Sequence, residues 1–336
     1  MSNLILAFET SCDDCCCSVV DTNYRVLSNV VSSQEEHQIF GGVVPEIASR
    51  AHLSSICDVM QLALTKAKKT LGDIDCFAVS TNPGLVGSLV VGLSFAKALA
   101  FSQNKPLVCV NHLQGHICSL LLEKPSFAPP FLALVVSGGH THLVDYENQE
   151  KFTTVGRSVD DAAGEAFDKA ATMLGLGFPG GVLIDNLAKD ADEHFFRFPR
   201  ARVKSSRYNF SFSGLKTAVF HYLQSKNSEF KKTHKKDIAA SIQRAIVEPL
   251  VSATLAYAKE NRVKKVVVAG GVSANSRLRS LFYEKAPKDL KIVFPNIKYC
   301  TDNAAMIAAA AVYKFKHKSF SDFSVNAFST KGIRTI

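Results

Sequence analysis

The sequence predicts a two-lobed α/β protein built from two copies of one unit. Short apolar runs typical of strands alternate with longer segments whose apolar residues recur at helical spacing. A strand followed by a polar turn occurs after Phe8 and again after Val136. A strand followed by glycine and a helix occurs after Ser80 and again after Ala269. There is no letter-by-letter repeat, but the order of elements indicates an internal duplication.

Each lobe is expected to alternate strands and helices, with a proline-rich linker at 125–130 between them. In the first lobe we expect strands over 4–8, 15–20, 25–31, 76–80 and 107–110, and helices over 45–69, 86–101 and 112–116. In the second we expect strands over 131–136, 143–146 and 265–269, and helices over 158–169 and from about 274. The predicted divisions are an N-terminal α/β lobe over 1–127, a C-terminal α/β lobe with a helical insertion over 128–304, and a helix and tail over 305–336 that pack back on the N-terminal lobe.

The composition is that of an ordinary globular protein. The 336 residues suffice for about two domains, and 47% hydrophobic with 21% charged residues is too apolar for a disordered chain. No apolar run reaches the roughly 18 residues of a membrane span, and the first residues lack a basic segment and cleavage site. We therefore expect a cytoplasmic protein with no membrane partner.

The nine cysteines are too sparse for a disulfide framework. Cys12 and Cys15 have the C-x-x-C spacing of zinc and redox sites, but no second pair follows. The sequence after Cys15 looks like a strand, whereas a redox motif begins a helix. Buried thiols are the simpler interpretation, and the zinc and redox alternatives stay open.

The net charge of +9 favours an anionic partner, nucleic acid first. Two basic runs stand out, and each could be a solvated face or an RNA contact. The first contains Arg197, Arg200, Arg202, Lys204 and Arg207 among aromatic residues, and the second contains Lys231, Lys232, His234, Lys235 and Lys236.

Three glycine pairs follow strands or begin helices, at 138–139, 180–181 and 270–271. Glycine lets the backbone approach a bound group closely, and a helix N-terminus favours an anion. Together the pairs indicate a nucleotide-sized anion, although each alone is an ordinary turn. The sequence has neither a P-loop nor a Rossmann fingerprint.

His112 and His116 are four residues apart, so a helix would present both from one side. Packing or chance explains such a pair as well as a metal does, and spacing alone does not connect Asp302 to it. The position after His112 is leucine, which disfavours a zinc protease. The acidic stretch 158–169 is either an exposed helix start or a site in which Asp168 and Lys169 hold polar groups of a ligand.

Eight motifs in order resemble those of one family. They are ETSCD at 9–13, PEIASR at 45–50, the His112/His116 pair, VSGGHT at 136–141, DDAAGEAFDK at 160–169, FSFSGLKT at 210–217, AGGVSAN at 269–275 and CTDN at 300–303. On these motifs the chain is similar, over nearly its whole length, to the bacterial tRNA N6-adenosine threonylcarbamoyltransferases, the TsaD family. That resemblance implies the actin/Hsp70-like (ASKHA) fold, with a nucleotide cleft between two duplicated lobes.

The resemblance also implies a reaction and its partners. Threonylcarbamoyl-AMP would donate its threonylcarbamoyl group to N6 of the adenosine just 3′ of the anticodon, in tRNAs that read ANN codons. The products would be t6A and AMP. The target lies in the single-stranded anticodon loop, and the expected protein partners are the paralogous subunit TsaB and the small ATPase TsaE.

By the same resemblance, His112, His116 and Asp302 bind one divalent metal, Fe²⁺ first and Zn²⁺ as the alternative. The residues implied to bind the adenylate are Val135, Val136, Ser137, Gly138, Gly139, Asp168, Gly181, Asp185 and Asn275. For a general base we favour Asp13, because the turn after the first strand would direct it into the cleft.

The chain departs from the family pattern at a few positions. Asp14 stands where we expect Glu, His142 where we expect Gln, and three cysteines replace apolar strand residues. Two other functions fit the same fold, an actin-like ATPase or sugar kinase and a non-enzymatic interaction subunit. The first leaves the histidine pair unused, and the intact motifs speak against the second.

Overall fold

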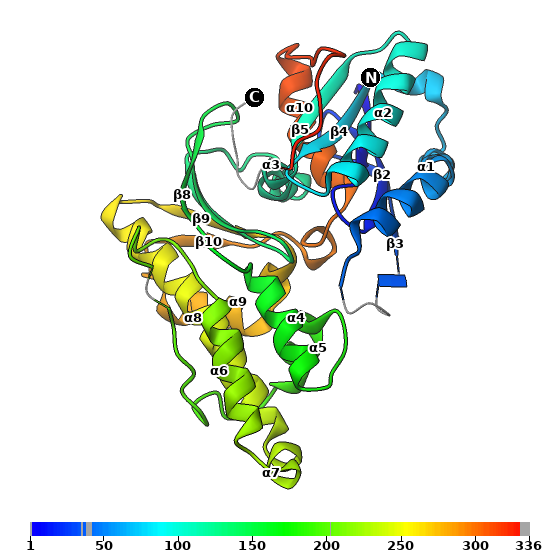
Figure 1. Cartoon of the computed structure of the whole chain (residues 1–336). Helices are drawn as coiled ribbons and strands as arrows, with labels where there is room; N and C mark the ends of the chain where they lie inside the picture. The colour runs from blue at the N-terminus through cyan, green and yellow to red at the C-terminus, as the bar shows by residue number, and fades with distance from the viewer. Residues whose placement is uncertain (1, 35, 38–41, 202, 330–336) are drawn as a thin grey trace. The chain divides into compact units, whose positions relative to one another are not determined.

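The computed structural model describes residues 2–34, 36–37, 42–201 and 203–329 (Figure 1). The chain forms two compact units, one of residues 1–128 with 295–336 and one of residues 129–294. Residues 295–304 thus group with the first unit, whereas the sequence analysis assigned them to the second lobe. Two hydrogen bonds hold this part of the chain to the first unit. The N–H of Asn296 donates to Glu123, and the N–H of Ala305 donates to Asn29. The end of the predicted tail, 330–336, lies outside the described residues.

The first unit is built on a five-stranded sheet of order β3-β2-β1-β4-β5. The strands are β1 (Leu4–Glu9), β2 (Asp14–Asp21), β3 (Val26–Ser33), β4 (Cys76–Asn82) and β5 (Leu107–Asn111). β1 and β3 run antiparallel to β2, whereas β1, β4 and β5 run parallel to one another. The three parallel strands therefore end at one edge of the sheet, where Glu9 and Asn111 stand.

Helices cover both faces of this sheet, which explains why its central strand, β1, is buried throughout. The helical elements are α1 (Pro45–Ala67), η2 (Leu71–Asp73), α2 (Val86–Ser102), α3 (His112–Cys118), η3 (Ser119–Leu122), η5 (Ile297–Tyr299) and α10 (Ala304–Lys316). Alternate side chains of β1 point to opposite faces: Leu6 and Phe8 pack in the core with α1 and α2, and Ile5 and Ala7 in the core with α10.

The second unit repeats the same sheet topology. Its strands are β6 (Phe131–Val136), β7 (Thr141–Tyr146), β8 (Phe152–Arg157), β9 (Lys265–Ala269) and β10 (Lys291–Val293), in the order β10-β9-β6-β7-β8. β7 is antiparallel to β6 and β8, and β6, β9 and β10 are parallel. Each strand thus corresponds to the strand five places earlier in the first sheet. The duplication predicted from the sequence is confirmed.

A helical layer packs against the sheet of the second unit. It consists of α4 (Ala163–Met173), α5 (Gly180–Leu187), α6 (Ser213–Gln224), α7 (Ser228–Thr233), α8 (Lys235–Glu260), η4 (Gly271–Ala274) and α9 (Ser276–Lys285). Leu132, Leu134 and Val136 of β6 share one hydrophobic core with residues of α4, α6, α8 and α9. Figure 1 shows α7 at the end of this unit that lies away from its sheet.

The structure contains the strands and helices that the sequence predicted, and one helix begins later than expected. The helix expected over 158–169 begins only at Ala163. Residue Asp160 before it accepts hydrogen bonds from the N–H of Phe212 and the hydroxyl groups of Ser211 and Ser213, and so ties this segment to the start of α6. In the described part of the chain, no helix combines the length and the hydrophobicity that crossing a membrane requires.

Gly270, at the end of β9, occupies a position that only glycine tolerates. Its φ is +91°, and a Cβ there would lie 2.4 Å from the carbonyl oxygen of Val136. We expect Gly270→Ala to lower the free energy of unfolding by at least about 2 kcal/mol, measured by urea denaturation. Gly214→Ala is the matched control, because a Cβ there meets no atom of the described residues within 4 Å and alanine favours the helix. Equal stability of the two variants would contradict this account.

Candidate functional site

The two histidines of the predicted metal site lie on α3, which begins directly after β5. The side chain of Asn111 accepts hydrogen bonds from the N–H groups of Leu113 and Gln114, at 2.9 and 3.2 Å, and so fixes the first turn of the helix. Because His112 and His116 are four residues apart, their rings lie on one side of α3, with centroids 4.7 Å apart. Both side chains are buried.

Asp302 reaches this pair because α10 packs very close to α3. At Gly115, between the histidines, a Cβ would lie 2.8 Å from Cδ1 of Ile307 on α10, so a larger residue would push the helices apart. The Oδ1 atom of Asp302 lies 3.1 Å from Nε2 of His116 and 3.7 Å from Nε2 of His112. The three candidate ligand atoms all lie within 4.8 Å of one another. The structure thus brings together the three residues that the resemblance pointed to.

A buried carboxylate, Glu9 at the end of β1, holds His112 from the other side. Its Oε2 lies 2.9 Å from Nδ1 of His112, and its Oε1 accepts a hydrogen bond of 2.5 Å from the N–H of Ser11. The Oγ of Ser11 is 3.0 Å from the same Nδ1. Since an ionised carboxylate only accepts hydrogen bonds, Nδ1 carries a proton and Nε2 is the atom turned toward Asp302 and His116.

The charges at this site favour a cation. Burial opposes a charge on His112, but the carboxylates of Glu9 and Asp302 outweigh it and raise the pKa of His112 to about 9. In the absence of a metal, Nε2 of His112 is therefore protonated at neutral pH, and a metal cation would take the place of that proton. Burial lowers the pKa of His116, so that ring is the more readily neutral ligand.

The donor set fits a divalent transition metal. Two imidazoles and one carboxylate are ligands that Fe²⁺ and Zn²⁺ accept, and three protein ligands leave positions open for a substrate atom. The buried Nδ1 of His116 has no hydrogen-bond partner among the described residues. The convergence of two Nε2 atoms on one carboxylate oxygen is the observation that supports a metal here.

Asp13, the candidate base, lies in the turn between β1 and β2, close to this group. The neighbouring Cys12 thiol is buried, and burial together with the charges of Asp13 and Asp302 raises its pKa. The carbonyl of Cys12 accepts a hydrogen bond of 2.8 Å from Nε2 of His52 on α1, which anchors the turn. Burial likewise raises the pKa of Asp14 to about 6.

The cysteine cluster has no ligand geometry in the described part of the chain. Cys12, Cys15, Cys16 and Cys17 are free thiols. Cys15 and Cys17 pack in the core with α1 and α2, and Cys16 packs in the core with α10, as alternation along β2 requires. The interpretation of this cluster as buried thiols is therefore the one that the structure supports.

In the second unit, the loop that follows β6 forms one of the predicted adenylate-binding segments. The carbonyls of Ser137 and Gly138 accept hydrogen bonds from the N–H groups of Gly164 and Glu165 at the start of α4, at 3.2 and 3.1 Å. A Cβ at Gly138 or Gly139 would meet none of the described atoms within 4 Å. One side of the loop is thus fixed by the helix, and the other side is open for a ligand.

Asp168 and Lys169 are occupied by contacts within the protein. Oδ1 of Asp168 accepts a hydrogen bond of 2.7 Å from the N–H of Gly180, which places Gly181 at the start of α5. The ammonium group of Lys169 lies 2.7 Å from both Asp161 and Glu165. The positive charge of Lys169 therefore offsets part of the negative charge of the acidic stretch.

Asp185 and Asn275 are brought together through Ser276. The Asp185 carboxylate accepts hydrogen bonds from the N–H and hydroxyl of Ser276, at 3.0 and 2.7 Å, and from Gln243 at 2.6 Å. Asn275 caps α9 by accepting a hydrogen bond from the N–H of Leu278. Its buried Nδ2 has no hydrogen-bond partner among the described residues, so it remains available as a donor to a ligand.

Sequence reasoning did not assign roles to Glu9, Gly115 and Gln243. A signal for Glu9 was present, because a carboxylate directly after five apolar residues of a central strand must be buried and paired. The roles of Gly115 and Gln243 depend on helices that are distant in sequence. No local pattern could have identified them.

The fold and the candidate metal centre define the class: a two-lobed α/β protein of the actin/Hsp70-like fold with a histidine pair and a carboxylate at the strand ends of its first lobe. A solved structure of component A of the (R)-2-hydroxyglutaryl-CoA dehydratase from Acidaminococcus fermentans shares the fold. Its TM-score is 0.57 at 17% identity, over 95% of this chain and 100% of that one.

The chain matches the family model of TsaD, tRNA N6-adenosine threonylcarbamoyltransferase, over residues 25–309. It is 49% identical to the tRNA N6-adenosine threonylcarbamoyltransferase of Caldicellulosiruptor bescii, over 96% of each chain. It is 47% identical to the enzyme of the same name from Clostridioides difficile, over 97% of this chain and 98% of that one. The chain belongs to the tRNA N6-adenosine threonylcarbamoyltransferase family.

The contact between Glu9 and His112 can be tested with Glu9→Gln. The Ser11 N–H would hold the amide oxygen, so the amide NH₂ would face Nδ1 of His112 and force the ring proton onto Nε2. We expect Zn²⁺ affinity, measured by calorimetry, to fall by about tenfold or more. In the metal-free protein, NMR titration should give His112 a pKa below about 9, because the charge of Glu9 is lost.

Glu147→Gln is the control for this variant, since Glu147 forms an exposed ion pair with Lys151. It should leave both measurements unchanged. A folded Glu9→Gln protein with the wild-type metal affinity would show that Glu9 does not orient His112.

Proposed function

We propose that this chain transfers the threonylcarbamoyl group from threonylcarbamoyl-AMP to N6 of the adenosine just 3′ of the anticodon, in tRNAs that read ANN codons. The products are t6A and AMP. Membership of the family, with the convergence of His112, His116 and Asp302, is the observation that carries this proposal.

The two lobes have separate tasks in this proposal. The first unit, residues 1–128 with 295–336, holds the metal through His112, His116 and Asp302. Fe²⁺ is the proposed metal, with Zn²⁺ as the alternative. The C-terminal lobe holds the adenylate through Val135, Val136, Ser137, Gly138, Gly139, Asp168, Gly181, Asp185 and Asn275. The second assignment is supported by the open side of the 137–139 loop and by Nδ2 of Asn275, which has no hydrogen-bond partner among the described residues.

The reaction makes one C–N bond and breaks one C–O bond. N6 of adenosine attacks the carbamoyl carbon, the bond from that carbon to the phosphate oxygen breaks, and AMP leaves with the electron pair. A divalent metal at the histidine pair would supply Lewis acidity, which the reaction needs because the adenine amine is a poor nucleophile. The chain's own part is to keep Nε2 of His112 and His116 directed at that position, through Glu9 and the cap at Asn111.

Asp13 is the proposed acceptor of the proton that N6 loses. It lies beside the Cys12–His52 contact, which fixes the backbone of its turn. Asp168 and Asp185 are less suited to this task, because both already accept hydrogen bonds from the backbone of the second unit. The charges of Asp13 and Asp302 both act on the Cys12 thiol, and among the described residues Asp13 accepts no hydrogen bond from a helix start, so it is the better base.

The resemblance also supports two protein partners, TsaB and TsaE, and a cytoplasmic location, where tRNA is modified. The first unit offers an apolar surface for the paralogous subunit TsaB. Helices α1 and α2 pack against each other and leave large apolar side chains exposed, among them Leu53 at 70%, Val90 at 45% and Phe101 at 79%. Isolated exposed apolar residues are ordinary, but several on one helix pair are typical of an interface.

The proposed activity is tested by nucleoside analysis of unmodified ANN-decoding tRNA, incubated with threonylcarbamoyl-AMP, this chain and its partners. We expect t6A with the wild-type chain. His116→Ala removes one of three metal ligands and should lower the rate by at least about 100-fold, with less bound metal by elemental analysis. His221→Ala, at an exposed position on α6, should behave like the wild type. Absence of t6A with folded, metal-loaded wild-type protein would refute the proposal.

The apolar surface on α1 and α2 is tested by Leu53→Glu and Val90→Glu. Since both side chains are exposed, the variants should fold normally, yet each should abolish co-purification with TsaB by burying a charge in the interface. Phe220→Glu, at a 47% exposed position on α6, is the control and should leave assembly intact. Unchanged assembly of all three variants would place the interface elsewhere.

A further inference from the structure

The two basic runs of the sequence have different surroundings in the second unit. In the first run, Arg200 forms an ion pair of 2.7 Å with Glu248, and Arg207 pairs with Glu260. Its aromatic residues are part of the packing, because Phe198 is fully buried and Phe196 lies against Tyr222. Arg202 lies outside the described residues. Much of the charge of this run is therefore balanced within the protein.

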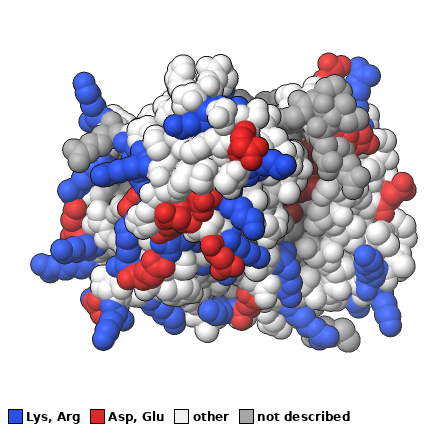
Figure 2. All heavy atoms as spheres, turned by 90° about the horizontal axis from the view of Figure 1, so that it is seen from below, with Lys and Arg blue, Asp and Glu red and all other residues white. Residues whose placement is uncertain are grey.

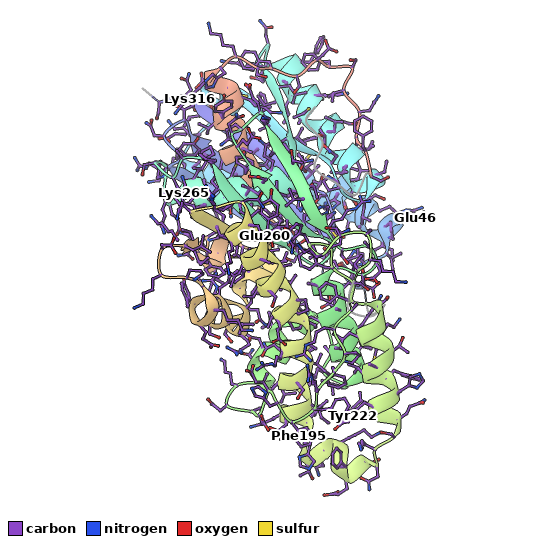
Figure 3. The ribbon with its side chains drawn as sticks, turned by 90° about the vertical axis from the view of Figure 1, so that its left-hand side faces the viewer. Glu46, Phe195, Tyr222, Glu260, Lys265 and Lys316 are labelled. Atoms are coloured by element: carbon purple, nitrogen blue, oxygen red, sulfur yellow. The ribbon has the colours of Figure 1, made fainter. Side chains whose placement is uncertain are left out.

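The aromatic packing continues into the end of the unit that carries α7. Figure 3 labels Phe195 and Tyr222 there, and Glu260 at the opposite end of α8. The ring of Phe195 stacks on that of His234, with centroids 4.7 Å apart. This packing fixes the turn between α7 and α8 in place.

The second run forms what we call the lysine tip, made of Lys226, Lys231, Lys232, Lys235 and Lys236. Residues 226–237 contain these five lysines and only two carboxylates, Glu229 and Asp237, a local net charge of +3. Within the part of the chain that the structure describes, no carboxylate lies within ion-pair distance of any of the five. Figure 2 shows the molecule from the side to which this end points, with Lys and Arg side chains spread over the face and acidic ones among them.

Part of the lysine tip carries its positive charge at positions that do not stabilise the free protein. Lys235 and Lys236 lie in the first turn of α8, where the helix dipole disfavours positive charge. Lys231, Lys232 and Lys235 line one hollow of about 220 Å³, so their like charges repel one another. A cluster with a net charge of +3, whose lysines form no ion pair among the described residues, is suited to an external anion.

Helix α4 connects this hollow with the 137–139 loop. The N–H of Gly164, in the first turn of α4, donates to the carbonyl of Ser137, and its last residue, Met173, lines the hollow. Eleven residues of helix span about 16 Å at about 1.5 Å per residue. At about 3.4 Å per phosphate, roughly five nucleotides cover that distance. A single RNA chain with one nucleotide at the loop can therefore reach the lysine tip.

We propose that the lysine tip binds the phosphate backbone of the tRNA substrate. This inference rests on the proposed function, since that function makes RNA the anion that must be held near the adenylate loop. The contact is with phosphates and is independent of base sequence, because ammonium groups on flexible chains do not read base edges.

The test uses Lys232→Gln/Lys236→Gln, which removes two exposed charges from the tip, in the full chain with its partners. Binding of unmodified tRNA is measured by fluorescence anisotropy over a range of salt concentrations. Two lost phosphate contacts should weaken binding by about 30-fold at 0.1 M salt and reduce the slope of log K against log salt by about 1.5. The control is Lys66→Gln/Lys68→Gln on the first unit, which removes the same charge from other exposed lysines and should change the slope little.

An equal loss in the control would mean that general charge, and not the lysine tip, drives binding, and would overturn the inference. An unchanged salt slope in the tip variant would also overturn the inference. The same holds if the tip variant loses binding to anionic lipid vesicles but binds tRNA like the wild type. The two proposals fail separately. If the wild type forms t6A but the tip variant binds tRNA normally, only the inference fails. If tRNA binds through the tip but no t6A forms, only the proposed function fails.

Discussion

The buried carboxylate of Glu9 imposes the constraint on which the first lobe depends. A charge at the end of a central strand, covered on both faces, requires a partner of opposite charge, and His112 is that partner. The contact fixes where α3 begins relative to β1. Helix α10 in turn packs against α3 at Gly115, where the absence of a side chain allows the close approach. A single ion pair thereby connects the strand end, the histidine pair and the aspartate from the far end of the chain.

The duplicated sheets place different kinds of residues at equivalent strand ends. The ends of β1 and β6 occupy equivalent positions in their sheets, yet one is followed by Glu9 and a polar turn and the other by Ser137 and two glycines. The first suits a cation, because its side chains present lone pairs. The second suits a phosphate or sugar, because it presents backbone on an open surface.

Most strands and the helices of the first lobe could be predicted, because a buried strand must be apolar and a covering helix must repeat its apolar residues. The ligand identities could be predicted only through the family motifs, since spacing relates His112 to His116 but nothing local relates either to Asp302. For the layer from α5 to α8, the sequence predicted a helical insertion but not its individual helices. Its aromatic and basic residues resemble an RNA-binding segment in sequence, whereas many of them, such as Phe198 and Arg200, are used for internal packing and ion pairs.

The return of the chain to its first unit has a consequence for synthesis on the ribosome. Nine of the twenty buried residues in the core on the α10 side of the first sheet come from α10 itself, residues 304–312. The second unit is a continuous stretch, 129–294, and contains its own core. During translation the second unit can therefore complete its fold while the first still exposes one face of its sheet. The histidine pair acquires Asp302 only after the second unit has been synthesised, so the candidate cation site is assembled later than the fold of that unit.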